Sequence, residues 1–196
     1  MLTIRSRATK WGSMGGVGHL GLGERAGEAF ELDARLTVVG RQLRAGERAP
    51  EFALDWLDPK GGTVTLVRLA HTVGQVRLLS IVNSVDMPVC QAETRRWEAL
   101  RADLPRSAQL YTVSMDLPFA LARWQAAAGV GHQLVSAHRD ERFARDYGVL
   151  LKEWRLLQRA VFVIGRDDRV AYAEYVADQR REPDYAAALA ATLRAG

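Results

Sequence analysis

The stretch VRLLSIVNSVDMPVC, residues 76–90, determines how the rest of the chain is interpreted. Its first part, residues 76–82, is almost continuously apolar, which is typical of a central strand covered on both faces. Residues 83–90 are rich in turn-forming side chains and end at Cys90. From 91 to 104 the apolar residues recur at helical spacing. The sequence therefore predicts a strand, a loop and a helix, with the loop delivering Cys90 to the start of the helix.

The predicted position of Cys90 has chemical consequences. Cys90 lies seven residues before Trp97, so the two side chains fall on the same inward face of the helix. In the first turn of a helix, unpaired backbone N–H groups and the helix dipole stabilise a thiolate. These residues alone leave two interpretations open, a reactive nucleophile or an inert buried cysteine that acts as a small hydrophobic residue.

Strands and helices alternate along the rest of the chain, which predicts an α/β sheet covered on both faces. Residues 36–40 and the polar turn 44–48 are expected to form an early hairpin before residues 49–52. A second hairpin and a terminal helix are expected at the end of the chain. The other predicted strands are 63–66, 109–114, 133–136, 159–164 and 170–176, and the other predicted helices are 118–127, 140–147 and 184–194.

The glycine-rich residues 1–33 sustain neither a strand period nor a helix period. We expect them to be a flexible leader before a single folded domain at 34–196. Residues 16–21 match G-x-G-x-x-G, the dinucleotide-binding fingerprint. The residues before this match form a poor strand, and Gly23 and Gly27 interrupt the helix that would have to follow. We therefore interpret the match as chance.

The composition of the 196 residues excludes several classes of function. A single cysteine excludes a disulfide within the chain, a four-cysteine zinc site and an iron–sulfur cluster. The scattered histidines predict no metal site. The formal net charge of +4 comes from arginines spread along the whole chain, which does not predict a nucleic-acid surface. No apolar run reaches the roughly 18 residues of a membrane span and no signal peptide is evident, so we expect a cytoplasmic protein.

A family resemblance is carried by SVDMPVC at residues 84–90, followed by TRRW at 94–97. This segment resembles the active-site segment of the thiol peroxidase branch of the peroxiredoxins. Other segments resemble the same family in order and spacing, and the resemblance extends from about residue 35 to residue 194. These segments are LTVVG at 36–40, SMDLPFA at 114–120, YGV at 147–149, RAVFVI at 159–164 and EPDY at 182–185.

The resemblance implies a thioredoxin-like fold with an N-terminal β-hairpin, usually in a homodimer, and no bound cofactor. It implies that Cys90 attacks a hydroperoxide and becomes a sulfenic acid. It also implies that Arg159, at the start of a late apolar strand, approaches the cysteine and polarises the peroxide, whereas position alone favours an ordinary strand-end ion pair. Pro88 suits the loop in either interpretation, because it fixes its own φ and favours extended geometry at Met87.

Two positions depart from the family pattern. Three residues before the cysteine, where the family usually has threonine and less often serine, this chain has Met87. A thioether cannot donate a hydrogen bond, and losing one bond of about 1.5–3 kcal/mol would slow the peroxide step by roughly ten- to two-hundred-fold. Simple packing beneath the loop is the alternative role for Met87. Where the family has its resolving cysteine, Gln125 follows Trp124, so no second cysteine can attack a sulfenic acid at Cys90.

We therefore expect an attenuated thiol peroxidase that reduces hydrogen peroxide and organic hydroperoxides through Cys90 and Arg159, with Met87 and Pro88 in the substrate-binding loop. Its one-cysteine cycle would use an external reductant, which is thioredoxin, glutaredoxin or a low-molecular-weight thiol. The alternative is a weakened descendant of the fold that acts as a redox sensor or protein-binding module. A third class, binding through the basic surface, predicts salt-dependent retention on nucleic acid.

Overall fold

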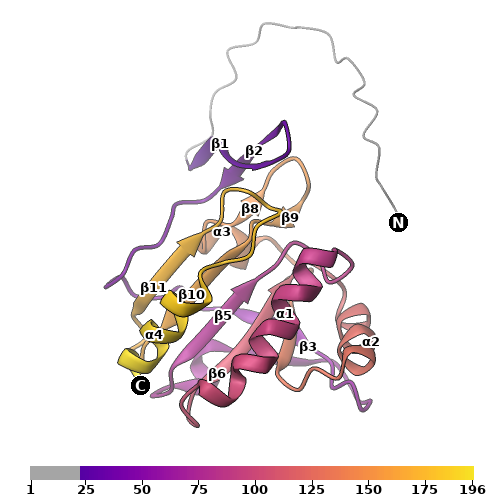
Figure 1. Ribbon diagram of the computed structural model, residues 1–196, viewed down its shortest axis with the longest axis vertical. Coiled ribbons are helices and arrows are strands. Elements are labelled where there is room, and N and C mark those ends of the chain that lie inside the picture. Colours follow the sequence, from indigo (N-terminus) through magenta and orange to yellow (C-terminus); the bar gives the residue numbers. More distant parts are fainter. Residues whose placement is uncertain (1–22) are drawn as a thin grey trace, which may run out of the picture.

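The computed structural model describes residues 23–196. The glycine match at 16–21 and most of the predicted leader lie outside the described residues. The described chain forms a seven-stranded sheet and a four-stranded sheet, and helices flank the larger one (Figure 1). Within residues 23–196, no helix combines the length and the apolar character needed to cross a membrane.

The larger sheet has the strand order β11-β10-β5-β6-β7-β3-β4. Near its centre, β5 pairs in parallel with β6 and antiparallel with β10, and β6 pairs in parallel with β7. All residues of β5 are buried, as its continuous apolar run predicted. The bounds are β3 Ala53–Trp56, β4 Thr65–Arg68, β5 Arg77–Ile81, β6 Gln109–Ser114, β7 Gln133–Ser136, β10 Ala160–Ile164 and β11 Val170–Tyr175.

Helices cover both faces of this sheet, which confirms the predicted fold class. On one face, α1 (Pro88–Leu100) and α4 (Tyr185–Ala195) enclose a core that contains Trp97, Leu78 and Ala188. Figure 1 shows both helices in front of the sheet strands.

The opposite face is covered by α3 (Arg142–Asp146) and the residues around it. Phe143 and Tyr147 pack there with Leu79 of β5 and Phe162 of β10. Leu79 follows Leu78 directly, and successive side chains of a strand point to opposite faces of the sheet. The two residues therefore pack in two separate hydrophobic cores. The last helix, α2 (Pro118–Ala128), packs beside β7 through residues such as Leu121 and Leu134.

The smaller sheet has the order β1-β2-β8-β9 and lies at the top of the view in Figure 1. An antiparallel hairpin of β1 (Glu24–Glu31) and β2 (Ala34–Val39) forms its first half. The short strands β8 (Leu150–Leu151) and β9 (Leu156–Leu157) complete it. The N-terminal β-hairpin that the resemblance implied is therefore present.

The predicted leader is wrong for residues 24–33, because these residues contain β1 and its turn. Ala29 is fully buried in this strand. The strand is difficult to recognise in the sequence because the pairing with β2 shifts between Arg25 and Ala29, at a bulge that contains Gly27 with a positive φ of 70°. A bulge interrupts the alternation of inward and outward side chains on which strand prediction depends.

The hairpin predicted from residues 36–40 and the polar turn 44–48 is also wrong. Strand β2 pairs with β1 and β8 instead. The next strand along the chain, β3, belongs to the larger sheet. The polar turn contacts the β10–β11 turn rather than closing a hairpin. Val170 N–H donates to the Glu47 carbonyl and Ala49 N–H donates to the Asp168 carbonyl, both at 2.8 Å.

The boundaries near the expected site are closer to the prediction. Strands β6 and β7 have the predicted bounds. Helix α1 begins at Pro88 rather than at residue 91, and the end of the predicted helix is a 3-10 turn at Arg101–Asp103. Proline is well suited to the first helical position, where its missing N–H needs no partner.

Candidate active site

Cys90 is the third residue of α1, with Met87 as the N-cap and Pro88 as the first helical residue. Its side chain is fully buried on the face that also carries Trp97. The prediction of a thiol in the first turn, on the inward face, is therefore confirmed. At this position the sulfur lies near the positive end of the helix dipole.

The guanidinium of Arg159 lies against the sulfur. Arg159 directly precedes β10, and Ala160 pairs with Ile81, the last residue of β5. This register places Arg159 beside the segment that follows β5, which leads into α1. The Nη2 atom of Arg159 is 3.2 Å from the Sγ atom of Cys90, and both side chains are fully buried. The sheet therefore brings together two of the residues that the sequence selected.

A buried carboxylate accompanies the arginine. Glu93, one turn of α1 after Cys90, forms an ion pair with Nη1 of Arg159 and accepts a hydrogen bond of 2.7 Å from the Ser80 hydroxyl. Burial raises the pKa of Glu93, although Arg159 and Ser80 oppose this effect. Burial would lower the pKa of Arg159, but Glu93 and Cys90 reverse the effect and the net direction is upward. The guanidinium beside the sulfur therefore keeps its positive charge.

Two residues with amide side chains, neither of which was predicted from the sequence, complete the polar shell. The Oδ1 atom of Asn83 is 3.9 Å from Cys90 Sγ and accepts a hydrogen bond of 3.4 Å from Nη2 of Arg159. Gln179, in the segment after β11, accepts from the same Nη2 atom through its backbone carbonyl at 3.2 Å. Asn83 could have been noticed because it follows the apolar strand, whereas nothing in the local sequence distinguishes Gln179.

Asp116 fixes the loop between β5 and α1. Its carboxylate accepts hydrogen bonds of 2.8 Å from the Ser84 hydroxyl and from Val85 N–H. It also accepts a bond of 2.9 Å from the Ser114 hydroxyl at the end of β6. The loop that leads to Cys90 is thus attached to the neighbouring strand.

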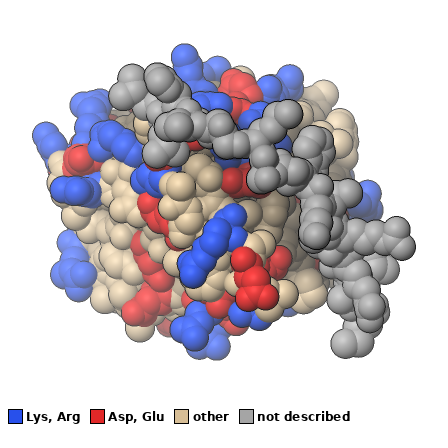
Figure 2. Space-filling model, turned by 90° about the horizontal axis from the view of Figure 1, so that it is seen from above, with Lys and Arg blue, Asp and Glu red and all other residues tan. Residues whose placement is uncertain are grey.

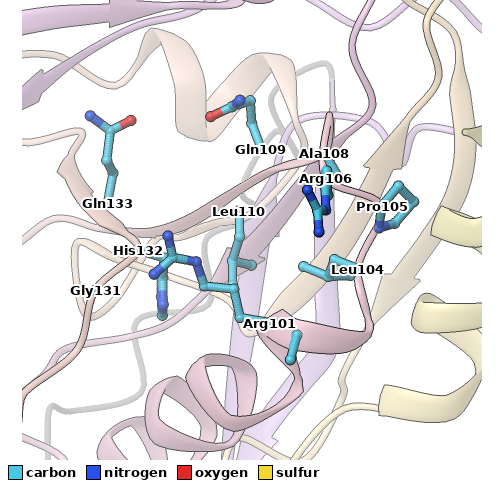
Figure 3. A pocket seen from close by; sticks show the side chains of 11 residues that line it. Arg101, Leu104, Pro105, Arg106, Ala108, Gln109, Leu110, Gly131, His132 and Gln133 are labelled. Carbon is cyan, nitrogen blue, oxygen red and sulfur yellow. The ribbon is translucent and has the colours of Figure 1, made fainter.

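A cavity of about 630 Å³ lies at the other end of α1 (Figure 3). Cys90 does not line this cavity, which lies near the beginnings of β6 and β7, so the cavity does not belong to the thiol site. Its lining residues are Arg101, Ala102, Leu104, Pro105, Arg106, Ala108, Gln109, Leu110, Gly131, His132 and Gln133.

The charges on the surface do not gather in one region of the face that Figure 2 shows. Blue cationic and red acidic side chains are interspersed there. Several arginines have carboxylate partners, including Arg41 with Glu47 and Arg145 with Glu141. On this face, therefore, the positive net charge does not form a continuous basic patch.

Residues 45–173 match the sequence model of the AhpC/TSA family. The chain belongs to this family. A thiol peroxidase of Halalkalibacterium halodurans is 41% identical over 161 residues, which cover 82% of this chain and 93% of the relative. A thiol peroxidase of Bacillus subtilis is 40% identical over 153 residues, which cover 76% of this chain and 87% of the relative.

Two solved structures share the fold of this chain. A peroxiredoxin-like protein from Aquifex aeolicus superposes with a TM-score of 0.76 at 27% identity, covering 88% of this chain and 99% of that structure. A thiol peroxidase from Chromobacterium violaceum superposes with a TM-score of 0.68 at 26% identity, covering 81% of this chain and 91% of that structure. The peroxiredoxin fold predicted from the resemblance is confirmed.

The structure shows the surroundings of Met87 and Gln125, the two residues that depart from the family pattern. Met87 is half-buried, and as the N-cap of α1 its side chain makes no capping hydrogen bond. Gln125 is buried in α2, and its Nε2 atom donates to the carbonyls of Val130 at 3.1 Å and His132 at 2.7 Å. Gln125 therefore joins the end of α2 to the segment that enters β7.

Proposed function

We propose that this protein is a thiol-dependent peroxidase that reduces hydrogen peroxide and organic hydroperoxides at Cys90. The observation that carries the proposal is the distance of 3.2 Å between Arg159 Nη2 and Cys90 Sγ in the first turn of α1. The thiolate is the nucleophilic form of cysteine, and a fixed guanidinium at a helix N-terminus favours that form. The thiol peroxidase relatives, at 40% and 41% identity, support the same activity.

In the first step, the Cys90 thiolate attacks the terminal oxygen of the hydroperoxide. An S–O bond forms and the O–O bond breaks, and the electron pair leaves with the other oxygen. That oxygen takes a proton and departs as water or an alcohol, and Cys90 becomes a sulfenic acid. Arg159 stabilises the negative charge as it moves from sulfur to the leaving oxygen, and its burial strengthens this effect.

Two residues at the start of α1 are proposed to bind the substrate. Met87 and Pro88 form the N-cap and the first residue of the helix that carries Cys90, so a peroxide that approaches the sulfur from this end meets them first. The thioether of Met87 supplies no hydrogen-bond donor to the peroxide. We therefore propose that the enzyme is attenuated relative to one with a hydroxyl at this position.

The second half of the cycle needs an external thiol, because Cys90 is the only cysteine of the chain. A thiol attacks the sulfenic sulfur, water leaves and a mixed disulfide forms. A second thiol then attacks this disulfide, which releases the Cys90 thiolate and an oxidised reductant. We propose thioredoxin or a low-molecular-weight thiol as the reductant.

Rapid mixing of the reduced protein with hydrogen peroxide and with cumene hydroperoxide tests the proposal. Sulfenic acid, trapped and located by mass spectrometry, is expected at Cys90 at a rate orders of magnitude above that of free cysteine. Cys90→Ser should give no sulfenic acid, and Arg159→Lys should be at least tenfold slower because the planar guanidinium fork is lost. A wild-type rate no higher than that of free cysteine would favour the redox-sensor or binding-module alternative.

Assembly and location are further parts of the proposal. We propose a homodimer, supported by the exposed apolar side chains of Leu117 and Phe119 at the start of α2, which are 54% and 62% exposed. Sedimentation at micromolar concentration tests this, since a monomer would contradict it. We also propose a cytoplasmic location, where thiol reductants are available. Cell fractionation tests that location.

A further inference from the structure

We propose that Gln179 is a positioning residue for the peroxidase reaction, which sets the orientation of Asn83 and the position of Arg159 against Cys90. This inference rests on the proposed function. Gln179 lies in the segment between β11 and α4, and its side chain is fully buried. It does not touch the sulfur, so it would act only through the two side chains that do.

The carboxamide of Gln179 is held in one orientation by four hydrogen bonds. Its Nε2 atom donates to the carbonyls of Val176 at 2.7 Å and Ala177 at 3.0 Å. Its Oε1 atom accepts from the backbone N–H of Arg159 at 2.9 Å and from Nδ2 of Asn83 at 3.1 Å. Both hydrogens of the amide and both lone pairs of its oxygen are therefore used.

This orientation determines which end of Asn83 faces the thiol. Nδ2 of Asn83 donates to Gln179 and, at 2.6 Å, to the carbonyl of Leu157. The Oδ1 atom is consequently directed at Nη2 of Arg159 and at Cys90 Sγ. Without the Gln179 oxygen, one N–H of Asn83 loses its partner, and a flipped amide would direct N–H groups at the guanidinium.

Gln179 also contacts both ends of Arg159. Its side chain accepts from the arginine backbone, and its own carbonyl accepts from the arginine Nη2 atom at 3.2 Å. The N-terminal hairpin supports this segment, because Phe30 N–H donates to the Ala177 carbonyl at 2.8 Å and Gln179 N–H donates to the Phe30 carbonyl at 2.9 Å. Strand β1 is thus linked to the thiol site through Gln179.

The test compares Gln179→Met with Gln158→Met. Methionine is unbranched and of similar length, so it fills the site without hydrogen bonds. Gln158 is a matched control because it is equally buried and donates to the same Val176 carbonyl, at 3.2 Å, while its side chain makes no hydrogen bond to Asn83 or Arg159. For each variant we would measure the rate of Cys90 with hydrogen peroxide and with iodoacetamide, a neutral alkylating agent, together with the melting temperature.

We expect Gln179→Met to lower the ratio of the peroxide rate to the iodoacetamide rate at least tenfold, and Gln158→Met to keep it within about twofold of wild type. A purely structural role would change the melting temperature or both rates together, and would leave the ratio unchanged. An unchanged ratio in a folded Gln179→Met protein would overturn the inference while leaving the proposed function intact. A wild-type protein with no acceleration toward peroxide would overturn both.

If Gln179→Met does not fold, the same ratio of peroxide rate to iodoacetamide rate can be measured for Gln179→Asn and compared with wild type. It keeps a carboxamide at the position but is one methylene shorter, so its oxygen no longer reaches both Asn83 and the Arg159 backbone. A ratio reduced at least threefold is expected. A wild-type ratio in this variant would contradict the positioning role.

Discussion

Arg159 and Glu93 form an ion pair in which both side chains are completely buried, and the same arginine contacts Cys90 through its other terminal nitrogen. The carboxylate fixes Nη1 and thereby leaves Nη2 directed at the sulfur. Removing one partner of such a pair leaves an uncompensated charge in the interior, which typically costs about 3–5 kcal/mol. The pair therefore links the stability of the domain to the geometry of the thiol site.

Glu93→Gln should lower both stability and reactivity. The amide keeps the size of the side chain and can still interact with Ser80, but Arg159 loses its counter-charge. We expect the free energy of unfolding in urea to fall by about 2–4 kcal/mol and the peroxide rate to fall at least tenfold. Glu98→Gln is the control for the peroxide rate, because this carboxylate of α1 pairs with His132 rather than with Arg159; its peroxide rate should stay at the wild-type level. Equal peroxide rates in wild type and Glu93→Gln would argue against a role for the pair.

Met87→Thr should raise the stability of the protein and its rate with peroxide through two independent effects. A threonine at the N-cap can accept a hydrogen bond from the first turn, which is worth about 1 kcal/mol in stability. Its hydroxyl can also donate to the peroxide, so the rate should rise by roughly ten- to two-hundred-fold. Met87→Val separates these effects from packing, because valine has the shape of threonine without the hydroxyl. If threonine and valine gave the same rate, the loss of a donor at this position would not explain attenuation.

Asp116→Asn should loosen the loop that delivers Cys90. An asparagine can keep one acceptor oxygen, but it presents N–H groups to at least one of the donors Ser84, Val85 and Ser114. We expect a stability loss of about 1–3 kcal/mol and faster alkylation of the buried thiol by iodoacetamide. Hydrogen exchange at Val85 provides a direct readout. Protection of that amide as strong as in wild type would contradict the assignment of Asp116 as the loop attachment.

The stability of the domain should fall in acid because of Glu98 and His132. The imidazole Nδ1 lies 2.7 Å from Glu98 Oε2, and Nε2 lies 2.9 Å from the Thr112 hydroxyl. The hydrogen bond from His132 lowers the pKa of Glu98 to about 2, and burial lowers the pKa of His132. Both groups bind protons more tightly in the unfolded chain, so their contribution is present above the ordinary pKa values and is lost in acid. It declines as the pH falls through the ordinary values of 6.5 for histidine and then 4.5 for glutamate.

Urea unfolding between pH 7 and pH 4 measures this dependence. In His132→Asn the amide can still donate to Glu98, but the histidine no longer titrates, so the decline between pH 7 and pH 5 should become shallower. A decline as steep as in wild type would assign the acid sensitivity to other groups.

The local pattern of the sequence predicted the parts of the fold that are continuous in the chain. The apolar run before Asn83 formed β5, and the helical spacing after it formed α1 with Cys90 on the buried face. Strand β1 was missed because the bulge at Gly27 interrupts its alternation. The helix start was placed late because Pro88 is compatible with both a loop and a first helical position.

The candidate site was harder to predict because its members meet only through the sheet register. Arg159 is 69 residues from Cys90 in the chain, and it was selected through the family resemblance rather than through any local pattern. Glu93 lies within the predicted helix, but its ion pair depends on that distant arginine. Gln179 was not found, because a polar residue in an ordinary connecting segment carries no local sign of its contacts.

The complete burial of Cys90 makes access to the sulfur a matter of molecular size. A hydroperoxide is small enough to enter through a brief local fluctuation, whereas a protein thiol must bring a sulfur atom of its own into bonding distance. In the proposed cycle we therefore expect a protein reductant to need the segment attached by Asp116 to move aside, and hydrogen peroxide to need a smaller displacement. Loosening this segment should then speed reduction by a protein thiol more than it speeds oxidation by hydrogen peroxide.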